Sequence, residues 1–231
     1  MKSVNAIFVK QSKDMFRNIG VLVMFIVFPI IALAMNRLIA GNVPGMEETH
    51  FVSMMASMFI GMGLIMSIAT IIAEDRESGS IRFLVIAGVK PMNYLLGVGG
   101  VVFVFSIVTS GAFGLIGGIA VSQAASFMAV MLSGAIASIL LGAIIGLMAK
   151  NVQAATGLTM PLGMALGLGP MAAGFNETVA GVFDIFYTKQ VSLVIENPYI
   201  SIVRPLTIIW INIAILAVAF ALVYKKKGRK N

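Results

Sequence analysis

The chain has 231 residues, of which 59% are hydrophobic and 11% are charged. A soluble domain is about 45–50% apolar and about 25% charged, so this composition excludes an ordinary soluble domain and indicates an integral membrane protein. Cysteine is absent, which excludes disulfides, thiolate metal sites and cysteine nucleophiles. The apolar segments are continuous rather than alternating, so helices are expected to span the membrane, not barrel strands. We therefore expect an all-α integral membrane protein, with residues 1–231 forming a single transmembrane domain.

Residues 1–18 form a separate element before the first long apolar segment. Val4, Ile7, Phe8 and Met15 recur near helical spacing, and the basic residues fall on other faces. This pattern predicts an amphipathic helix that lies in the membrane interface. The alternative is a disordered basic tail.

Six segments are long and apolar enough to span a bilayer, which takes about 20 residues. In chain order they are Ile19–Met35, Val52–Ala73, Tyr94–Ala120, Phe127–Ala149, Val152–Ala173 and Ile202–Tyr224. The fifth carries Pro161 and Pro170, and each proline removes a backbone donor from the helix. The first has no small-residue cleavage site after it, so we interpret it as a retained helix rather than a signal peptide.

The distribution of lysine and arginine predicts the orientation, because cytoplasmic loops carry an excess of both. With both termini in the cytoplasm, all of the 16 basic residues lie on the cytoplasmic side except Arg37, Lys189 and Arg204. We therefore expect both termini to be cytoplasmic. The basic tail, residues 225–231, would anchor this orientation and could contact anionic membrane lipid.

Residues 174–204 are expected to lie outside and have an amphipathic middle. They cannot form one more complete span, because a seventh would place the basic tail outside. We interpret the segment as one or two short helices that dip into the outer leaflet or lie on it.

The loop between the second and third spans, residues 74–91, reads EDRESGSIRFLVIAGVKP and holds six charged residues. Burying six charges in a bilayer would cost on the order of 15–20 kcal/mol, so this loop must lie in water. Its residues Ile81, Leu84, Val85 and Gly88 fall at helical spacing. The pattern predicts a short amphipathic helix at the membrane surface.

Several kinds of chemistry are disfavoured. Every ionisable residue is expected at a helix end or in a loop, which argues against ion-coupled carriers and intramembrane hydrolysis. The only histidine, His50, stands beside Glu47 and Glu48, and a solvated loop residue is favoured over a metal ligand. The chain has no GxxxxGK[ST] phosphate loop, so any ATP-driven motor must be another polypeptide. No enzymatic activity is expected.

Small residues recur four apart in the fourth and fifth spans. They are Ser138, Gly142 and Gly146, and then Gly163 and Gly167. Such spacing allows close helix approach. We favour packing within the bundle over a subunit contact or a mobile seam.

The run EDRESGSIRFLVIAGVKPMNYLLG resembles the cytoplasmic loop of ABC-2 type permeases, the membrane subunits of type-2 ABC exporters. That family carries an acidic and basic cluster, a Gly followed by Ser or Thr, a Leu, and a Pro at the start of the third span. Here these are residues 74–77, Gly79 and Ser80, Leu84, and Pro91. The wider layout is also similar, with an amphipathic N-terminal helix, six spans and an extended outer segment before the last. The chain is short for the family.

The resemblance implies that the loop contains a coupling helix, which docks on a separate ATP-binding cassette ATPase with residues 1–18 nearby. It also implies two ATPase copies, a second permease copy or close relative, and outer re-entrant helices that close the pathway. No cofactor, metal or nucleic acid is expected. The candidate ATPase-coupling residues are Glu74, Asp75, Arg76, Glu77, Gly79, Ser80, Ile81, Arg82, Leu84, Val85 and Pro91.

Within this set, the two glutamates are expected to orient the loop and the two arginines to pair with acidic groups on the ATPase. The apolar contact is assigned to Ile81, Leu84 and Val85, at roughly 1.5–3 kcal/mol for each buried side chain. The alternative is a surface helix that only anchors the bundle.

The leading functional hypothesis is an export permease in the plasma membrane of a prokaryote. Its substrate would be hydrophobic or amphipathic, such as a drug, a lipid-like compound or a small membrane-active peptide such as a bacteriocin. One alternative is an ATP-independent carrier or channel, which would need an intramembrane charge or a hydrated filter. Another is a non-transporting membrane immunity or scaffold protein that binds a peptide at the outer segment.

Overall fold

The structure is a computed structural model and describes residues 2–43 and 49–228. The side chains of residues 2, 3, 82, 85, 91 and 226–228 lie outside this description, as do Glu47 and Glu48. Every regular element in the described residues is a helix. The long elements are α2 (Ile19–Leu38), α3 (Thr49–Met58) continued by η2 (Phe59–Gly63) and α4 (Leu64–Glu77), α6 (Pro91–Ile116), α7 (Val121–Met148), α8 (Val152–Ala173) and α11 (Val203–Gly228). The short ones are α1 (Lys2–Arg17), η1 (Ala40–Asn42), α5 (Ser80–Ile86), α9 (Glu177–Phe183) and α10 (Tyr187–Glu196).

Five of the described helices are long and apolar enough to cross a membrane. They are Ile19–Leu38, Thr49–Glu77, Met92–Ile116, Val121–Met148 and Val203–Lys225. The pair α9 and α10, which is bent by 115°, counts as a broken span or a re-entrant loop and would make a sixth. The prediction of an all-α integral membrane protein is confirmed.

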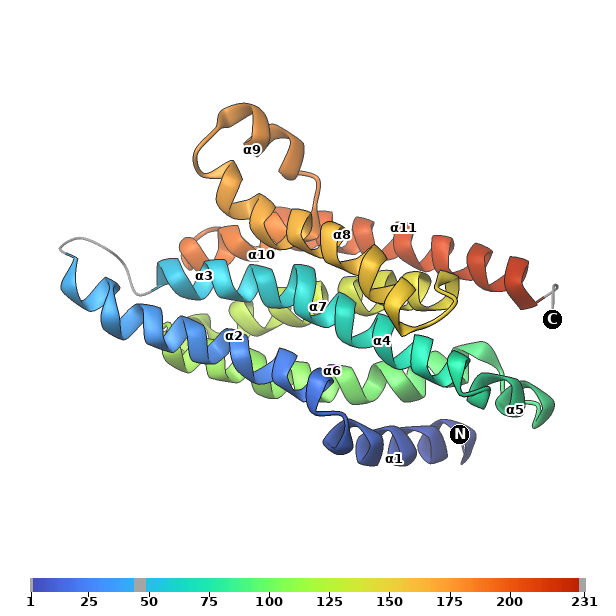
Figure 1. Cartoon of the computed structure of the whole chain (residues 1–231). Helices are drawn as coiled ribbons and strands as arrows, with labels where there is room; N and C mark the ends of the chain where they lie inside the picture. The colour runs from blue at the N-terminus through green and yellow to red at the C-terminus, as the bar shows by residue number, and fades with distance from the viewer. Residues whose placement is uncertain (1, 44–48, 229–231) are drawn as a thin grey trace.

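Helix α8, the fifth predicted span, is not among these five. Its 22 residues reach about 33 Å, which is long enough, but its prolines, glycines and threonines make it less apolar. Figure 1 shows α8 running along the bundle, and it packs against α3, η2 and α4. Thr156 and Thr159 satisfy their hydroxyls by donating to carbonyls one turn earlier in α8. Its place as a span therefore remains a prediction from length and position.

Most boundaries lie one to four residues from the predicted ones, and two differences have a local explanation. The third span was expected to run to Ala120, but α6 ends at Ile116. The glycine at position 118 has φ +60°, a left-handed conformation that ends the helix and that other residues rarely adopt. The fourth span was expected to begin at Phe127, but α7 begins at Val121. The less apolar residues 121–126 were left out of the predicted span, and they are helical as well.

The predicted small-residue rows pack inside the chain. A Cβ on Gly142 would lie 2.6 Å from the carbonyl oxygen of Ile65, and α7 therefore presses against α4 with almost no space between backbones. A Cβ on Gly61, in the π-helical turn η2, would likewise lie 2.6 Å from the backbone nitrogen of Gly167 in α8. The interpretation of these rows as bundle packing is confirmed at these positions.

The outer segment folds as two short helices, in line with the expectation. Helix α10 packs against α3, α7, α8 and α11 and is almost wholly enclosed by protein. Lys189 is only 8% exposed, although the sequence pattern placed it in an outer loop. A polar backbone segment at membrane depth is tolerated only where protein or water surrounds it, and α10 meets that condition.

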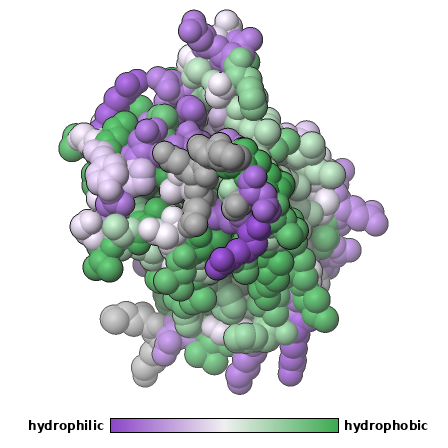
Figure 2. Space-filling model, turned by 90° about the vertical axis from the view of Figure 1, so that its left-hand side faces the viewer, coloured by the Kyte–Doolittle hydropathy of each residue, from purple (hydrophilic) through white to green (hydrophobic). Residues whose placement is uncertain are grey.

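Segments that are far apart in the sequence gather at each end of the bundle. In Figure 1 the N-terminal α1, α5 and the end of α11 lie at one end, and α9, the end of α2 and the start of α3 lie at the other. Figure 2 looks onto the α9 end, where hydrophilic residues gather on part of the facing surface and hydrophobic residues cover the flank beside them. The predicted cytoplasmic segments thus share one end. Which end faces the cytoplasm stays a prediction.

Candidate functional site

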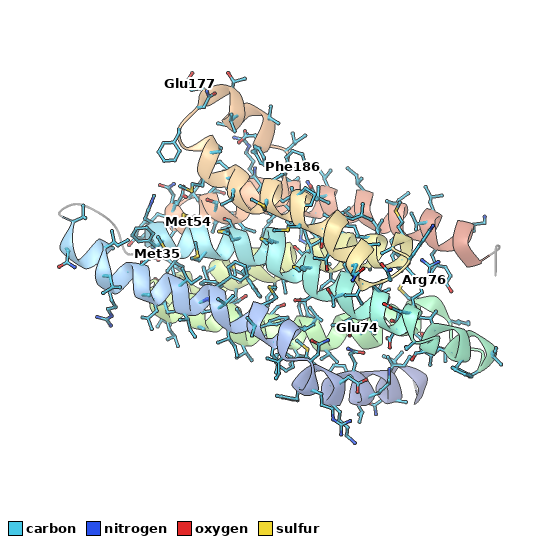
Figure 3. All side chains as sticks on the ribbon, viewed as in Figure 1. Met35, Met54, Glu74, Arg76, Glu177 and Phe186 are labelled. Carbon is cyan, nitrogen blue, oxygen red and sulfur yellow. The ribbon has the colours of Figure 1, made fainter. Side chains whose placement is uncertain are left out.

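The last turn of α4 carries four consecutive charged residues, 74–77. Successive residues of a helix point about 100° apart, so four in a row face every side of its axis. Each of these four side chains makes a hydrogen bond to a different part of the chain. Figure 3 labels Glu74 and Arg76 in this region, close to the end of the bundle that carries α5.

Asp75 is turned into the protein and is only 9% exposed. Its Oδ1 lies 3.1 Å from Lys10 Nζ on α1, and its Oδ2 accepts a 2.7 Å hydrogen bond from the hydroxyl of Tyr94 on α6. Burial lowers the pKa of Lys10, but the carboxylates of Asp75 and Asp14 outweigh that effect and leave the pKa raised. Both carboxylate oxygens of Asp75 are therefore satisfied within the chain.

Glu74 binds the junction between α1 and α2. The Asn18 amide donates to both of its carboxylate oxygens, at 2.9 and 3.0 Å. Asn18 is also the N-cap of α2, because its Oδ1 accepts from the backbone N–H of Val21 at 3.2 Å. The Asn18 side chain thus starts one helix and ties it to the end of another.

Arg76 and Glu77 hold the connection between α7 and α8. Arg76 Nη1 donates to the carbonyl oxygens of Leu147 at 3.0 Å and Ala149 at 2.6 Å. The last carbonyls of a helix have no intrahelical partner and carry the negative end of its dipole, so a guanidinium is well suited to bind them. Glu77 Oε2 accepts from the N–H of Val152, the first residue of α8, at 3.3 Å. A carboxylate there faces the positive end of that helix.

Two glycines shape the loop that follows. Gly79, between α4 and α5, has φ +75°, and Gly88, after α5, has φ +74°. Both values lie in the left-handed region, which strains other residues. Ser80 begins α5, and its hydroxyl lies 2.8 Å from that of Ser78. Pro91 occupies the first turn of α6, where its missing N–H has no helical partner to lose.

Helix α5 exposes two apolar side chains that the sequence analysis did not name. Ile81 and Leu84 are partly buried against the core, whereas Phe83 is 74% and Ile86 is 75% exposed. The side chains of Arg82 and Val85 lie outside the described residues. Sequence reasoning missed Phe83 and Ile86 because α5 reads SIRFLVI and is apolar on most sides, so spacing alone does not select a face.

The structure thus divides the candidate residues into two groups. Residues 74–77 are engaged inside the chain, and the predicted pairing of Arg76 with acidic groups of a partner would compete with its bonds to α7. Ile81 and Leu84 are partly buried, and among the described side chains of α5 the exposed apolar ones are Phe83 and Ile86, which were not candidates. In the described part of the chain there is no group of three histidine, cysteine or acidic side chains placed to hold a metal ion.

Comparison with known proteins gives one result for most of the chain. Residues 41–225 match the family model described as ABC-2 family transporter protein. A search of curated proteins found no match.

Proposed function

The chain belongs to the ABC-2 family of transporter proteins, which makes it a multi-pass membrane component of an ABC transport system, and we propose that it is the permease of an ATP-driven exporter. The family implies association with an ABC ATPase subunit, and ATP hydrolysis takes place on that subunit. We assign both termini and α5 to the cytoplasm of a prokaryotic cell. The functional unit would contain two permeases, identical or closely related, and two ATPases.

The observation that carries this proposal is the exposed apolar tip of α5. Phe83 and Ile86 stand out from a helix whose base is held by glycine-bounded turns and by the bonds of residues 74–77. In water this surface is unfavourable, and burying two such side chains would contribute roughly 1.5–3 kcal/mol each. In this family the partner expected at this end of the bundle is the ATPase, and Phe83 and Ile86 would dock in a groove on it.

The same geometry supports a route for the mechanical signal. A displacement of α5 would be transmitted to the last turn of α4, which directly precedes it. The hydrogen bonds of residues 74–77 would then transmit it to α1, α6, α7 and α8. ATP binding would draw the two α5 helices together and favour one arrangement of the bundle over another. This is a population shift driven by the differential affinity of the ATPase for the two states.

A hydrophobic or amphipathic substrate agrees with the interior of the bundle. Several buried hydroxyls are already satisfied by their own helix, such as Ser67 on Gly63 and Ser106 on Val102. Such an interior offers little to a small ion, which needs compensation for its lost hydration. Drugs, lipid-like compounds and small membrane-active peptides remain the substrate classes that fit.

Reconstitution tests the proposal. The chain and the ATPase that binds it would be placed together in proteoliposomes, and movement of rhodamine 6G and of an NBD-labelled phospholipid would be followed by fluorescence. We expect transport of at least one probe only with ATP and an ATPase able to hydrolyse it. Equal transport without ATP, or without the ATPase, would overturn the proposal.

A further inference from the structure

We propose that Asp75 is a positioning residue that clamps α1 to the base of α4 and to α6, so that α1 and α5 move as one body. The consequence for transport rests on the proposed function, whereas the clamp is a property of the chain alone. From the sequence, Asp75 was a candidate for contact with the ATPase. Its burial and its two internal partners assign it a different role.

The first argument is the coordination of the carboxylate. Asp75 is almost fully buried, and each oxygen has one strong partner, Lys10 Nζ at 3.1 Å and the Tyr94 hydroxyl at 2.7 Å. A buried carboxylate without partners is strongly unfavourable, so these two bonds are coupled to its burial. The partners come from positions 65 and 19 residues away, so the clamp joins three helices.

The second argument is that α1 is held at two points along its length. Lys10 binds Asp75 near the middle of α1, and Asn18, directly after its end, binds Glu74. Both acceptors lie in the same turn of α4. Two attachment points prevent a helix from swinging about either of them, so α1 must follow any movement of that turn.

The third argument is the packing of α1 on α6. The side chain of Ile7 lies against Gly97, where an added Cβ would come within 2.5 Å of it. Ile7, Gln11 and Met15, one turn apart, form the buried face of α1. The apolar contact by itself would allow α1 to slide along α6, and the directional bonds to Asp75 fix its register.

A matched pair of carboxylates on the same lysine provides the test. Lys10 Nζ lies 3.1 Å from Asp75 and 3.5 Å from Asp14, which is on α1 itself. Asp75→Asn weakens the bond between helices, and Asp14→Asn makes the same chemical change without touching it. Because the chain has no cysteine, single cysteines can be introduced at will.

Spin labels on Asn5→Cys in α1 and on Ala87→Cys after α5, both exposed, would report the distance between the two elements. The chain alone in lipid nanodiscs suffices, so the result does not depend on the ATPase. We expect a single narrow distance distribution in the parent and in Asp14→Asn, and at least a twofold broader one in Asp75→Asn. An unchanged distribution in Asp75→Asn would overturn the clamp.

Two further variants keep the test decisive if Asp75→Asn fails to fold. Lys10→Gln changes a half-exposed side chain and should broaden the distribution in the same way. The exchange of Lys10→Asp with Asp75→Lys should restore at least part of the narrow distribution, which a merely structural effect of losing Asp75 would not. Absence of any broadening in Lys10→Gln would also contradict the proposal.

A second readout connects the clamp to transport. In proteoliposomes with the ATPase, Asp75→Asn should still co-purify with it through α5, yet move at least fivefold less rhodamine 6G or NBD-labelled phospholipid for each ATP hydrolysed. Asp14→Asn should match the parent. If the spin-label result holds but this ratio is unchanged, the clamp exists without a coupling role and this part of the inference fails.

Discussion

At the α5 end of the bundle, charged side chains fasten helices to one another and leave an apolar helix exposed. At the α9 end the arrangement is reversed, because the polar helix α10 is itself enclosed. Thr188, Lys189 and Gln190 are at most 8% exposed there. Charged side chains at the first end bind helix ends, Asn18 and one another, and they leave the apolar side chains of Phe83 and Ile86 exposed.

The enclosed end is held by a compact hydroxyl and carboxylate group. Ser53 on α3 and Ser192 on α10 both donate to Glu196 Oε1 at 2.9 Å. Asp184, the C-cap of α9, forms an exposed ion pair with Arg204 of α11 at 2.9 Å. Exposed pairs contribute little, so α10 is held mainly by burial, by the Ser53 contact and by the 3.1 Å hydrogen bond from Ser138 on α7 to the Tyr187 hydroxyl. The difference teaches that the α5 end leaves apolar side chains exposed, as our proposal of an ATPase contact requires, whereas the α9 end encloses its polar helix within the chain.

The largest expected effect concerns the exposed tip. Phe83→Asp combined with Ile86→Asp should lower co-purification of the ATPase at least tenfold, because two charges would enter an apolar contact. The matched control is Val121→Asp combined with Tyr199→Asp, since those side chains are 94% and 91% exposed. This control should retain the ATPase. Equal binding by both double variants would remove the proposed distinction between the two ends.

The second effect compares an ion pair in which only the carboxylate is buried, Lys10 with Asp75, with the more exposed pair of Arg204 and Asp184. Lys10→Met leaves the buried Asp75 carboxylate with only Tyr94, and we expect a loss of about 1–3 kcal/mol in unfolding free energy. Arg204→Gln disrupts an exposed pair and should cost about 0–1 kcal/mol. Denaturant unfolding in detergent measures both. A larger loss for Arg204→Gln would contradict the assignment of strong polar contacts to the α5 end.

The third effect tests how α10 is held. Ser53→Ala and Ser192→Ala should each cost about 0.5–1.5 kcal/mol, because each removes a donor to Glu196. The double variant should cost a different amount from the sum, since both hydroxyls share Oε1 and lie 2.8 Å from each other. Strict additivity in the same unfolding assay would show that the two serines act independently.

The smallest effect is the pH dependence of the clamp. The pKa of Lys10 is raised above its ordinary value of 10.5, so the contribution of Lys10 to stability is complete below that pH and is lost as the pH rises through the higher folded-state pKa. Spin labels at positions 5 and 87 should therefore report a narrow distribution at pH 8 and a broader one only in strongly alkaline solution. Because Lys10 is half exposed, the change should be modest. Broadening already at pH 9 would point to another titrating group.

The sequence by itself determined the membrane class, the positions of most spans and the segments that share an end. These properties depend on local composition and on helical spacing, which act within about 20 residues. It also selected residues 74–91 as the candidate functional loop, since a dense group of charges cannot lie in a bilayer. The glycine rows and the amphipathic α1 were predicted for the same local reason.

Only the tertiary structure decided which contacts the residues of that loop make. Arg76 reaches carbonyls 71 and 73 residues away, and Asp75 reaches a lysine 65 residues away, and no local pattern specifies such partners. The exposed face of α5 was undecided for a related reason. A helix that is apolar on most sides shows its outer face only when its neighbours cover the rest, and here they cover Ile81 and Leu84 and leave Phe83 and Ile86 to the solvent.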